Sequence, residues 1–193
     1  MSESQRVSLI APCRNERDHV DAFCDSALAQ QLPPGWQMEL LVADGASDDG
    51  TRARLDARAA QDARLRVIDN PGRIVSTGLN AALAAARGAV IVRLDMHTVF
   101  APDYVAECLA ALARSGADNV GDPREKKKQG AWGRAIAAAF QCRLVVGGAR
   151  SRDAAYEGEA DTVYLGCWPR ATFERIGSFD EQLVRNQDDE HNL

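Results

Sequence analysis

An aspartate and a histidine two positions apart, Asp95 and His97, are side chains that together can hold a metal ion. On an extended backbone, residues i and i+2 point to the same side. A carboxylate and an imidazole on one face can bind a divalent cation, and this mixed ligand set suits Mn²⁺ at least as well as Mg²⁺. Such a cation neutralises the charge of a departing diphosphate. An isolated Asp-x-His tripeptide is short, and by itself it is more typical of a turn carboxylate beside an exposed histidine.

Two further groups of carboxylates could take part in chemistry. Asp44 follows an apolar segment and can accept a hydrogen bond from an imide N–H, although its glycine and serine neighbours also favour a simple turn. Asp48 and Asp49 precede a predicted helix start, where capping is the expected role. Near the chain end, Asp188 and Asp189 are adjacent acids, and their mutual repulsion makes one of them a candidate general base. Composition alone favours a solvated charged stretch there.

The elements that would position these side chains alternate between short apolar runs and helical periodicity. The predicted strands cover residues 7–11, 38–43, 65–68 and 89–94. The predicted helices begin near residue 20, cover 51–62, run from a cap at Ser76 or Thr77 to Gly88, and start again at Pro102. This order predicts an α/β fold with a right-handed, doubly wound, mostly parallel sheet. Ligands of such sheets bind outside the carboxyl ends of the strands, so the polar residues after the first, second and fourth strands are expected to line one cleft.

The pattern after residue 117 is weaker. It predicts a helix around 131–140, a strand over 161–168 and a short helix over 170–176, and the chain then ends in a charged segment, 186–193. We therefore expect a single domain over 1–193 that is truncated at its C-terminus. Residues 1–115 would form one half of it and residues 116–193 the other.

Composition excludes several classes of protein. The chain has 193 residues, 46% of them hydrophobic and 26% charged, which is enough to bury a core in one domain. A net charge of −5 and a pI of about 5.2 argue against general nucleic-acid binding. The five cysteines are widely spaced without a CxxC pair, which favours a reduced, cytoplasmic protein. No signal peptide or apolar stretch of about 20 residues is present, so we expect a soluble chain.

Six segments together resemble the family-2 glycosyltransferases, most closely the succinoglycan-biosynthesis (ExoA-like) members. They occur in family order, with similar gaps, over nearly the whole chain. The segments are APCRNE at 11–16, VADGASDDGT at 42–51, NPGRIVSTGLNAALAAARG at 70–88, RLDMHTVFAPDYV at 93–105, DTVYLGCWPRATFERIGSFDE at 161–181 and NQDDE at 186–190. The resemblance implies the GT-A (Rossmann-like) fold.

The resemblance also implies roles for single residues in the first half of the chain. Asp95 and His97 would stand where the family has its DxD motif and would hold the metal and the diphosphate. Histidine replaces the commoner aspartate there, which leaves the choice between Mn²⁺ and Mg²⁺ open. The other expected nucleotide-binding residues would border the nucleoside (Pro12, Asn15, Glu16), bind the uracil (Asp44) or lie near the nucleotide (Arg73).

In the second half, the resemblance implies that the catalytic base is Asp188, with Asp189 as the second choice. Gly166 and Trp168, together with Cys167, would lie on the acceptor side, where an indole can stack on a sugar ring. The implied reaction is an inverting, single-displacement transfer of a hexose from a UDP-linked donor to a hydroxyl of a saccharide or lipid-linked acceptor in polysaccharide biosynthesis. Membrane association is expected only for a longer parent protein, at the cytoplasmic face.

Other chemistries fit the sequence less well. A DxDGT-type phosphatase needs its nucleophile directly at a strand end, but the strand here ends at Asp44, four residues before Asp48. The glycine-rich motifs of nicotinamide-dependent oxidoreductases and P-loop proteins are absent, as is the glycine-rich, basic loop expected of a sugar-nucleotide pyrophosphorylase. A module that binds a nucleotide sugar without catalysis, or one inactivated by truncation, remains an open alternative.

Overall fold

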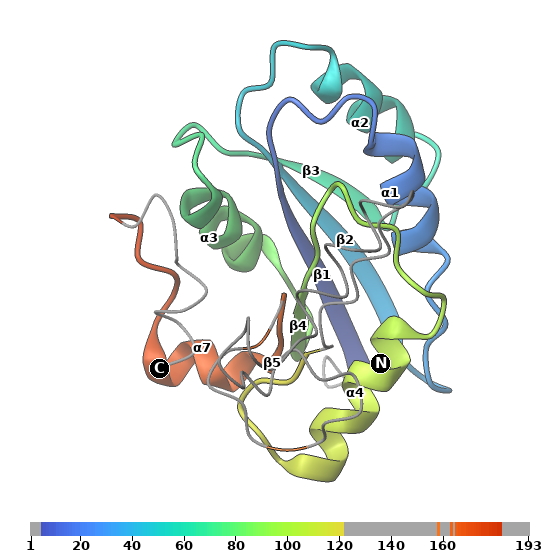
Figure 1. Cartoon of the computed structure of the whole chain (residues 1–193), viewed down its shortest axis with the longest axis vertical. Coiled ribbons are helices and arrows are strands. Elements are labelled where there is room, and N and C mark those ends of the chain that lie inside the picture. Colours follow the sequence, from blue (N-terminus) through green and yellow to red (C-terminus); the bar gives the residue numbers. More distant parts are fainter. Residues whose placement is uncertain (1–4, 122–157, 159–162, 164, 183–193) are drawn as a thin grey trace, which may run out of the picture.

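The computed structural model describes residues 5–121, 158, 163 and 165–182 of the chain (Figure 1). The described strands are β1 (Arg6–Cys13), β2 (Gln37–Asp44), β3 (Leu65–Asp69), β4 (Val90–Arg93) and β5 (Cys167–Pro169). The described helices are α1 (Val20–Leu28), α2 (Thr51–Ala59), α3 (Val75–Ala85), α4 (Tyr104–Ser115) and α7 (Arg170–Ile176). The predicted helix at 131–140 and the charged segment at 186–193 lie outside the described residues.

The strands form one sheet in the order β3-β2-β1-β4-β5. The pairs β1–β2, β1–β4 and β2–β3 are parallel, and β5 pairs antiparallel with β4. The predicted mostly parallel, doubly wound α/β sheet is therefore confirmed. The strand predicted over 161–168 is shorter and later than expected, since β5 begins only at Cys167. An antiparallel edge strand of this kind is common on otherwise parallel sheets.

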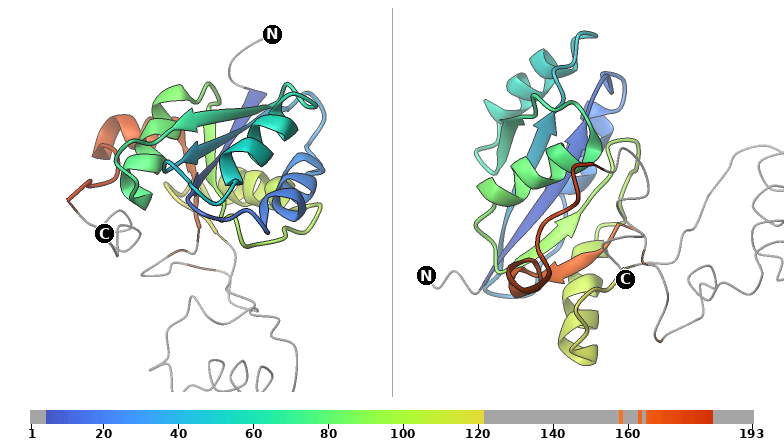
Figure 2. Two further views of the ribbon diagram at one scale, coloured as in Figure 1. Left: turned by 90° about the horizontal axis from the view of Figure 1, so that it is seen from above. Right: turned by 90° about the vertical axis from the view of Figure 1, so that its left-hand side faces the viewer.

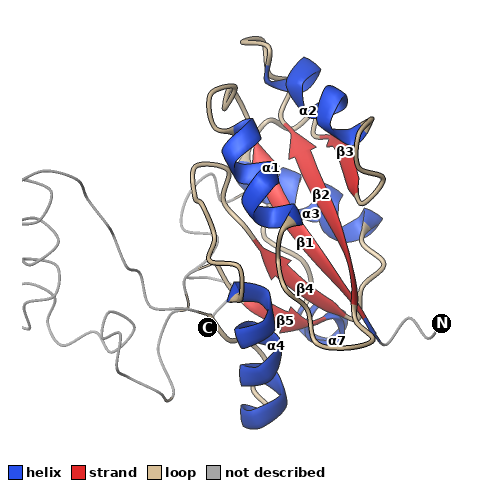
Figure 3. Cartoon of the chain, turned by 90° about the vertical axis from the view of Figure 1, so that its right-hand side faces the viewer, coloured by secondary structure: helices blue, strands red, loops and turns tan. Residues whose placement is uncertain are grey.

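Helices cover both faces of the sheet, as the alternating sequence pattern requires. Helices α1, α2 and α4 pack on one face, and α3 and α7 pack on the other. The right-hand view of Figure 2 has α3 and α7 in front of the sheet, and Figure 3, from the opposite side, has α1 and α4 in front. In β1, Leu9 belongs to the first core and Ile10 to the second, because neighbouring side chains of a strand point to opposite faces. Both are fully buried.

The start of α3 differs from the prediction. Ser76 and Thr77 are not caps, because the helix already begins at Val75. The Thr77 hydroxyl lies inside the first turn, and its one hydrogen is shared between the side-chain oxygen of Asn70, at 2.7 Å, and the carbonyl of Ile74, at 3.0 Å. Asn70, at the end of β3, thus ties the strand to the helix. Such a tertiary contact competes with local capping and is invisible to a sequence pattern.

A tight turn leads into β5. Leu165 and Gly166 both have positive φ values, 63° and 86°, and a side chain costs energy in this region. A Cβ added to Gly166 would lie 2.2 Å from Cη2 of Trp168. Trp168 is 3% exposed and packs against Phe173 and Phe179, with ring centroids 5.5 and 6.2 Å away. Gly166 is therefore required both by the backbone and by the indole beside it.

Within the described residues, no helix is long and apolar enough to cross a membrane.

Replacing Gly166 with alanine is expected to destabilise the fold strongly. The variant adds a left-handed alanine and a clash with Trp168, which together cost about 3 kcal/mol or more. Gly116→Ala is the matched control, because Gly116 also has a positive φ, 63°, but an added Cβ meets nothing within 4 Å. It is expected to cost only about 1 kcal/mol. Urea denaturation of both variants measures the difference, and equal losses would contradict the assigned role of Trp168.

Candidate functional site at the carboxyl edge of the sheet

The loops that follow the parallel strands meet at one edge of the sheet. Cys13, the last residue of β1, is in register with Asp44, the last residue of β2, and β4 ends at Arg93, in register with Ile10 of β1. Asn15 and Ala46, each two positions past its strand, have φ values of 56° and 54°. Left-handed conformations of residues other than glycine cost energy and concentrate at functional sites. This edge is therefore the candidate site.

Asn15 joins the first loop to the second. Its side-chain oxygen accepts the N–H of Asp48 at 3.0 Å, and its side-chain nitrogen donates to the Asp48 carboxylate at 3.0 Å. Its backbone N–H donates to the Ser47 hydroxyl at 2.9 Å. Asp48 is thus not a helix cap, as the local pattern indicated, but the partner of Asn15. The Asn15 amide shapes the site by holding two loops together.

A second set of hydrogen bonds runs beside the first. The Thr51 hydroxyl accepts the N–H of Glu16 at 2.8 Å and donates to the Asp49 carboxylate at 2.6 Å. Asp49 also accepts the N–H of Thr51, at 2.9 Å, and that of Arg17, at 3.2 Å. Asp49 therefore bonds the first turn of α2, as predicted, and also holds the loop after β1. These donors, above all the Thr51 hydroxyl, keep the pKa of Asp49 below its usual value.

Asp44 offers a buried carboxylate at the centre of this edge. It is 3% exposed, and the Ser47 hydroxyl donates to its Oδ1 at 2.6 Å. Arg52 Nη1 lies 4.0 Å from Oδ2. The Ser47 backbone N–H also donates to Oδ2, at 3.4 Å. An ionised carboxylate has about four acceptor positions, so these three contacts leave room for one donor of a ligand. Burial strengthens such a bond because water does not compete for it.

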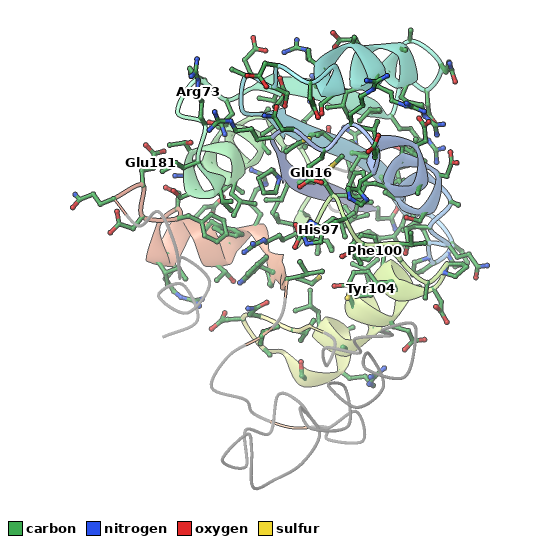
Figure 4. The ribbon with its side chains drawn as sticks, turned by 45° about the horizontal axis from the view of Figure 1, so that its top comes forward. Glu16, Arg73, His97, Phe100, Tyr104 and Glu181 are labelled. Carbon is green, nitrogen blue, oxygen red and sulfur yellow. The ribbon has the colours of Figure 1, made fainter. Side chains whose placement is uncertain are left out.

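Asp95 and His97 do come together, and two further residues join them. His97 Nε2 lies 3.5 Å from Asp95 Oδ2, and His97 Nδ1 lies 3.9 Å from Oε1 of Glu16. The other oxygen of Glu16 lies 3.8 Å from Nε2 of His19. Glu16 thus sits between two imidazoles, and Figure 4 shows it facing His97. Sequence reasoning missed His19, although its position three residues after Glu16 is a usable signal.

The pair Asp95 and His97 fits a divalent cation only as part of a larger ligand set. No cluster of three or more His, Cys, Asp or Glu side chains suited to a metal occurs in the described part of the chain. Asp95 is 26% and His97 57% exposed, so a ligand can reach both side chains. A site with one carboxylate and one imidazole matches a cation that takes its other ligands from phosphates and water.

Pro12 and Arg73, two other predicted residues, lie toward α3. Pro12 is half-buried, and a Cβ added to Gly78 of α3 would lie 3.3 Å from its Cβ. Arg73 is exposed on the loop between β3 and α3 with a φ of 61°, and its N–H donates to the Asn70 carbonyl at 3.1 Å. In Figure 4 it lies on a loop separate from that of Glu16. The structure thus places Arg73 on the same edge but not in contact with the Glu16 group.

The thiol of Cys13, the last residue of β1, stays protonated and is not a nucleophile. Cys13 is buried next to Asp44 and Glu16. Burial, and then the negative charges of these two carboxylates, raise the pKa of its thiol well above the usual value. A protonated thiol neither attacks an electrophile nor binds a metal readily. The chemistry of this edge therefore belongs to its carboxylates and imidazoles.

The structure describes only some of the site residues that were predicted for the second half of the chain. Trp168 was predicted to stack on a sugar ring, but at 3% exposed it is covered by Phe173 and Phe179 and lies in the core. The acceptor-side role of Trp168 stays a prediction, and what the structure shows is the burial of its indole. Gly166 supports the same packing, and its carbonyl accepts the N–H of Arg93 at 3.0 Å. Asp188 and Asp189 lie outside the described residues.

Comparison with known proteins assigns the chain to one protein family. The family profile described as "Glycosyl transferase family 2" matches residues 8–169. The succinoglycan biosynthesis protein ExoA of Rhizobium meliloti (strain 1021) is 30% identical over 184 residues, which cover 94% of this chain and 55% of that protein. The putative teichuronic acid biosynthesis glycosyltransferase TuaG of Bacillus subtilis (strain 168) is 36% identical over 106 residues, covering 53% of this chain and 40% of that protein. The chain thus spans about half the length of its ExoA relative.

Solved structures show the same fold. The mannosyltransferase PcManGT from Pyrobaculum calidifontis, in complex with GDP-Man and Mn²⁺, has a TM-score of 0.73 at 22% identity, over 98% of this chain and 51% of that one. TarS 1-349 of S. aureus, in complex with UDP, has a TM-score of 0.68 at 15% identity, over 97% of this chain and 54% of that one. The expected GT-A fold is confirmed.

Replacing Asp49 with asparagine is expected to weaken the contact between the two loops. Three N–H or O–H donors face this carboxylate, and an amide nitrogen cannot accept from them. Because the folded-state pKa is lowered, the unfolded chain binds more protons between that value and about 4. The stabilisation that ionised Asp49 contributes is therefore fully present above about pH 4, and it is lost as the pH falls through the folded-state pKa.

The measurement is the free energy of unfolding of both proteins against pH, from neutral down to about 2.5. Asp49→Asn is expected to be less stable at neutral pH and to lose less stability on acidification. Asp103→Asn is the control, since Asp103 makes no side-chain capping bond to α4 in the described structure. Parallel curves for Asp49→Asn and the unmodified chain would show that Asp49 is not the acid-sensitive link.

Proposed function

The chain belongs to glycosyl transferase family 2, and from that premise we propose that it transfers a hexose from a UDP-linked donor to a hydroxyl group in polysaccharide biosynthesis. The acceptor is a saccharide or a lipid-linked saccharide. The observation that carries this proposal is that a buried carboxylate, Asp44, and an accessible pair, Asp95 and His97, lie at one edge of the sheet. The buried carboxylate suits the uracil ring of the donor, and the accessible pair suits a metal-bound diphosphate. The name of the ExoA relative supports the polysaccharide context.

In this proposal the nucleoside lies over the loops after β1 and β2. Asp44 accepts the imide N–H of uracil, and its carboxylate is buried and already oriented by Ser47. Asn15 acts by fixing the contact between the loops, Pro12 and Glu16 border the nucleoside, and Arg73 approaches the nucleotide from the β3–α3 loop. One solved neighbour is in complex with UDP, which supports a uridine nucleotide.

The divalent cation, Mn²⁺ or Mg²⁺, would be held by Asp95 and His97 together with the donor diphosphate. When bound, it neutralises the charge of the departing nucleoside diphosphate. The neighbour in complex with GDP-Man and Mn²⁺ supports such an ion. Glu16 lies next to His97 Nδ1 and helps orient the ring so that Nε2 stays beside Asp95.

The proposed reaction is one displacement with inversion at the anomeric carbon. Asp188, or as second choice Asp189, accepts the proton of the acceptor hydroxyl while its oxygen bonds to C1 and the bond from C1 to the diphosphate breaks. The positive charge that develops on the sugar resembles that in glycoside hydrolysis. Residues 1–115 are the nucleotide-binding half of this domain and residues 116–193 the acceptor-side half, with Gly166 supporting the packing at their junction.

The proposed location is the cytoplasm, at the cytoplasmic face of the membrane for a longer parent. The four cysteines in the described part of the chain are all buried and unbridged, as is typical of a reducing compartment.

Removing either proposed metal ligand is expected to abolish metal-dependent nucleotide binding. Calorimetric titration of UDP with Mn²⁺ is expected to show binding that EDTA removes, with GDP binding more weakly. Asp95→Ala and His97→Ala are each expected to weaken it at least about 100-fold, since the loss of even an outer-shell partner costs about 10–100-fold. Asp18→Ala, which removes an exposed charge after β1, is the control. Unchanged UDP affinity in Asp95→Ala would refute this metal site.

Catalysis is expected to depend on Asp188 while donor binding does not. Asp188→Asn is expected to lower the rate of sugar transfer, or of donor hydrolysis, by about 10²–10⁴-fold, the usual contribution of a general base. UDP affinity should stay as in the unmodified chain. Asp189→Asn is the matched control and is expected to have the smaller effect. A chain that binds UDP-hexose but never consumes it would instead favour the binding-module alternative.

A further inference from the structure

A hollow of about 500 Å³ lies at the amino ends of β1, β2 and β3, at the edge of the sheet opposite Asp44 and Asp95. Three separate segments contribute arginines to its lining: the start of β1, the start of β3 with its preceding loop, and the loop between α3 and β4. These arginines are Arg6, Arg64, Arg66 and Arg87, and a single carboxylate, that of Glu39, lies among them. The excess of positive charge stands out in a chain with a net charge of −5.

Glu39 is part of the framework of this hollow. Its side chain is 9% exposed, and its Oε1 accepts the Ser8 hydroxyl at 2.7 Å and the backbone N–H of Arg87 at 2.6 Å. Its Oε2 lies 3.4 Å from Nη1 of Arg66, which also donates to the Ala85 carbonyl at 3.1 Å. The Glu39 carboxylate therefore has hydrogen-bond donors and a positive charge beside it, and it holds both Arg66 and the backbone of Arg87 in place.

Two arginines at this hollow, Arg6 and Arg87, form no ion pair with a described residue. Among the residues that the structure describes, neither Arg6 nor Arg87 has a carboxylate within ion-pair distance. Within the described residues, the Arg6 guanidinium makes a long hydrogen bond of 3.5 Å to Oε1 of Gln37. Arg64, in contrast, pairs with Asp62 at 2.6 Å. A guanidinium carries five donors in a planar fork that matches two oxygens of a phosphate.

The rest of the lining combines apolar side chains with the amides of Gln30 and Gln37. Leu32 and Trp36 are half-buried and pack against the core, and Met38 is 8% exposed. A cavity of this size, with a lining of arginines, amides and apolar side chains, suits an organic ligand that combines an anionic group with a neutral portion. An inorganic ion alone would leave the apolar wall uncovered.

We propose that this hollow binds the phosphate group of a phosphorylated organic ligand, with Arg6 and Arg87 as the phosphate contacts and Arg66 as a fixed positive charge behind them. The ligand is either a soluble phosphoester or the headgroup of an anionic lipid. The site does not depend on the proposed sugar transfer. Some six to seven residues of strand, roughly 20 Å, separate it from the carboxyl edge of the sheet.

The test is titration of the whole chain with glycerol 3-phosphate in EDTA, with glycerol as the neutral control. Arg6→Gln and Arg87→Gln are each expected to weaken binding roughly tenfold, since a hydrogen bond to a charged group is lost. Arg114→Gln removes an exposed charge at the far end of α4 and is expected to leave binding unchanged. Asp95→Ala is also expected to bind normally, which separates this site from the nucleotide site.

Vesicles distinguish the two sources of the phosphate. Binding of free glycerol 3-phosphate that both arginine variants weaken supports a soluble phosphoester. Binding only to phosphatidylcholine vesicles that contain phosphatidic acid, again weakened by both variants, supports a lipid headgroup. If neither probe binds, or if Arg114→Gln weakens binding as much as Arg87→Gln does, the proposal is overturned. Circular dichroism of each variant confirms that the fold is retained, as expected for arginines at the surface.

Discussion

Backbone hydrogen bonds join β1 in parallel to β2 on one side and to β4 on the other, and the rest of the structure depends on this pairing. Parallel pairing sends every connecting helix back across a face of the sheet, so both faces must be apolar. It also brings the ends of all these strands to one edge. Residues as distant in sequence as Glu16 and His97 therefore come within 4 Å of each other. No single segment of the chain could assemble that group alone.

The loops at this edge are held by one another. Asn15 and Ala46 adopt left-handed conformations that local energetics disfavour. Hydrogen bonds offset that cost. Asn15 and Asp48 bond each other, and the N–H groups of Glu16 and Arg17 in the first loop donate to the side chains of Thr51 and Asp49. Polar side chains that sequence alone would assign to ligand binding or capping are thus used to shape the backbone. Asp44, Asp95 and His97 are the residues to which we assign the ligand, and the hydrogen-bonded loops support them.

The two edges of the sheet differ in charge. Carboxylates and imidazoles gather at the carboxyl edge, where we propose that a cation and a diphosphate bind. Arginines gather at the amino edge, around the compensated Glu39. The two sites that we propose lie at opposite ends of the same strands, roughly 20 Å apart, so a ligand bound at one makes no contact with the other. The buried Ser8, which bonds both Glu39 and the backbone of Gly88, ties the amino edge to the central strand.

The sequence by itself determined the α/β class, the order of the elements and the edge at which the site lies, because strand and helix periodicities are local properties of the chain. It also placed Asp95 and His97 on one side, since their spacing matches an extended backbone. Only the tertiary structure decided which polar residues are free for a ligand. The side chains of Asn15 and Asp48 form hydrogen bonds that join two loops, and Phe173 and Phe179 pack against the buried Trp168. The pairing of His19 with Glu16, and the gathering of arginines from three segments, likewise arise from distances across the fold that no local pattern encodes.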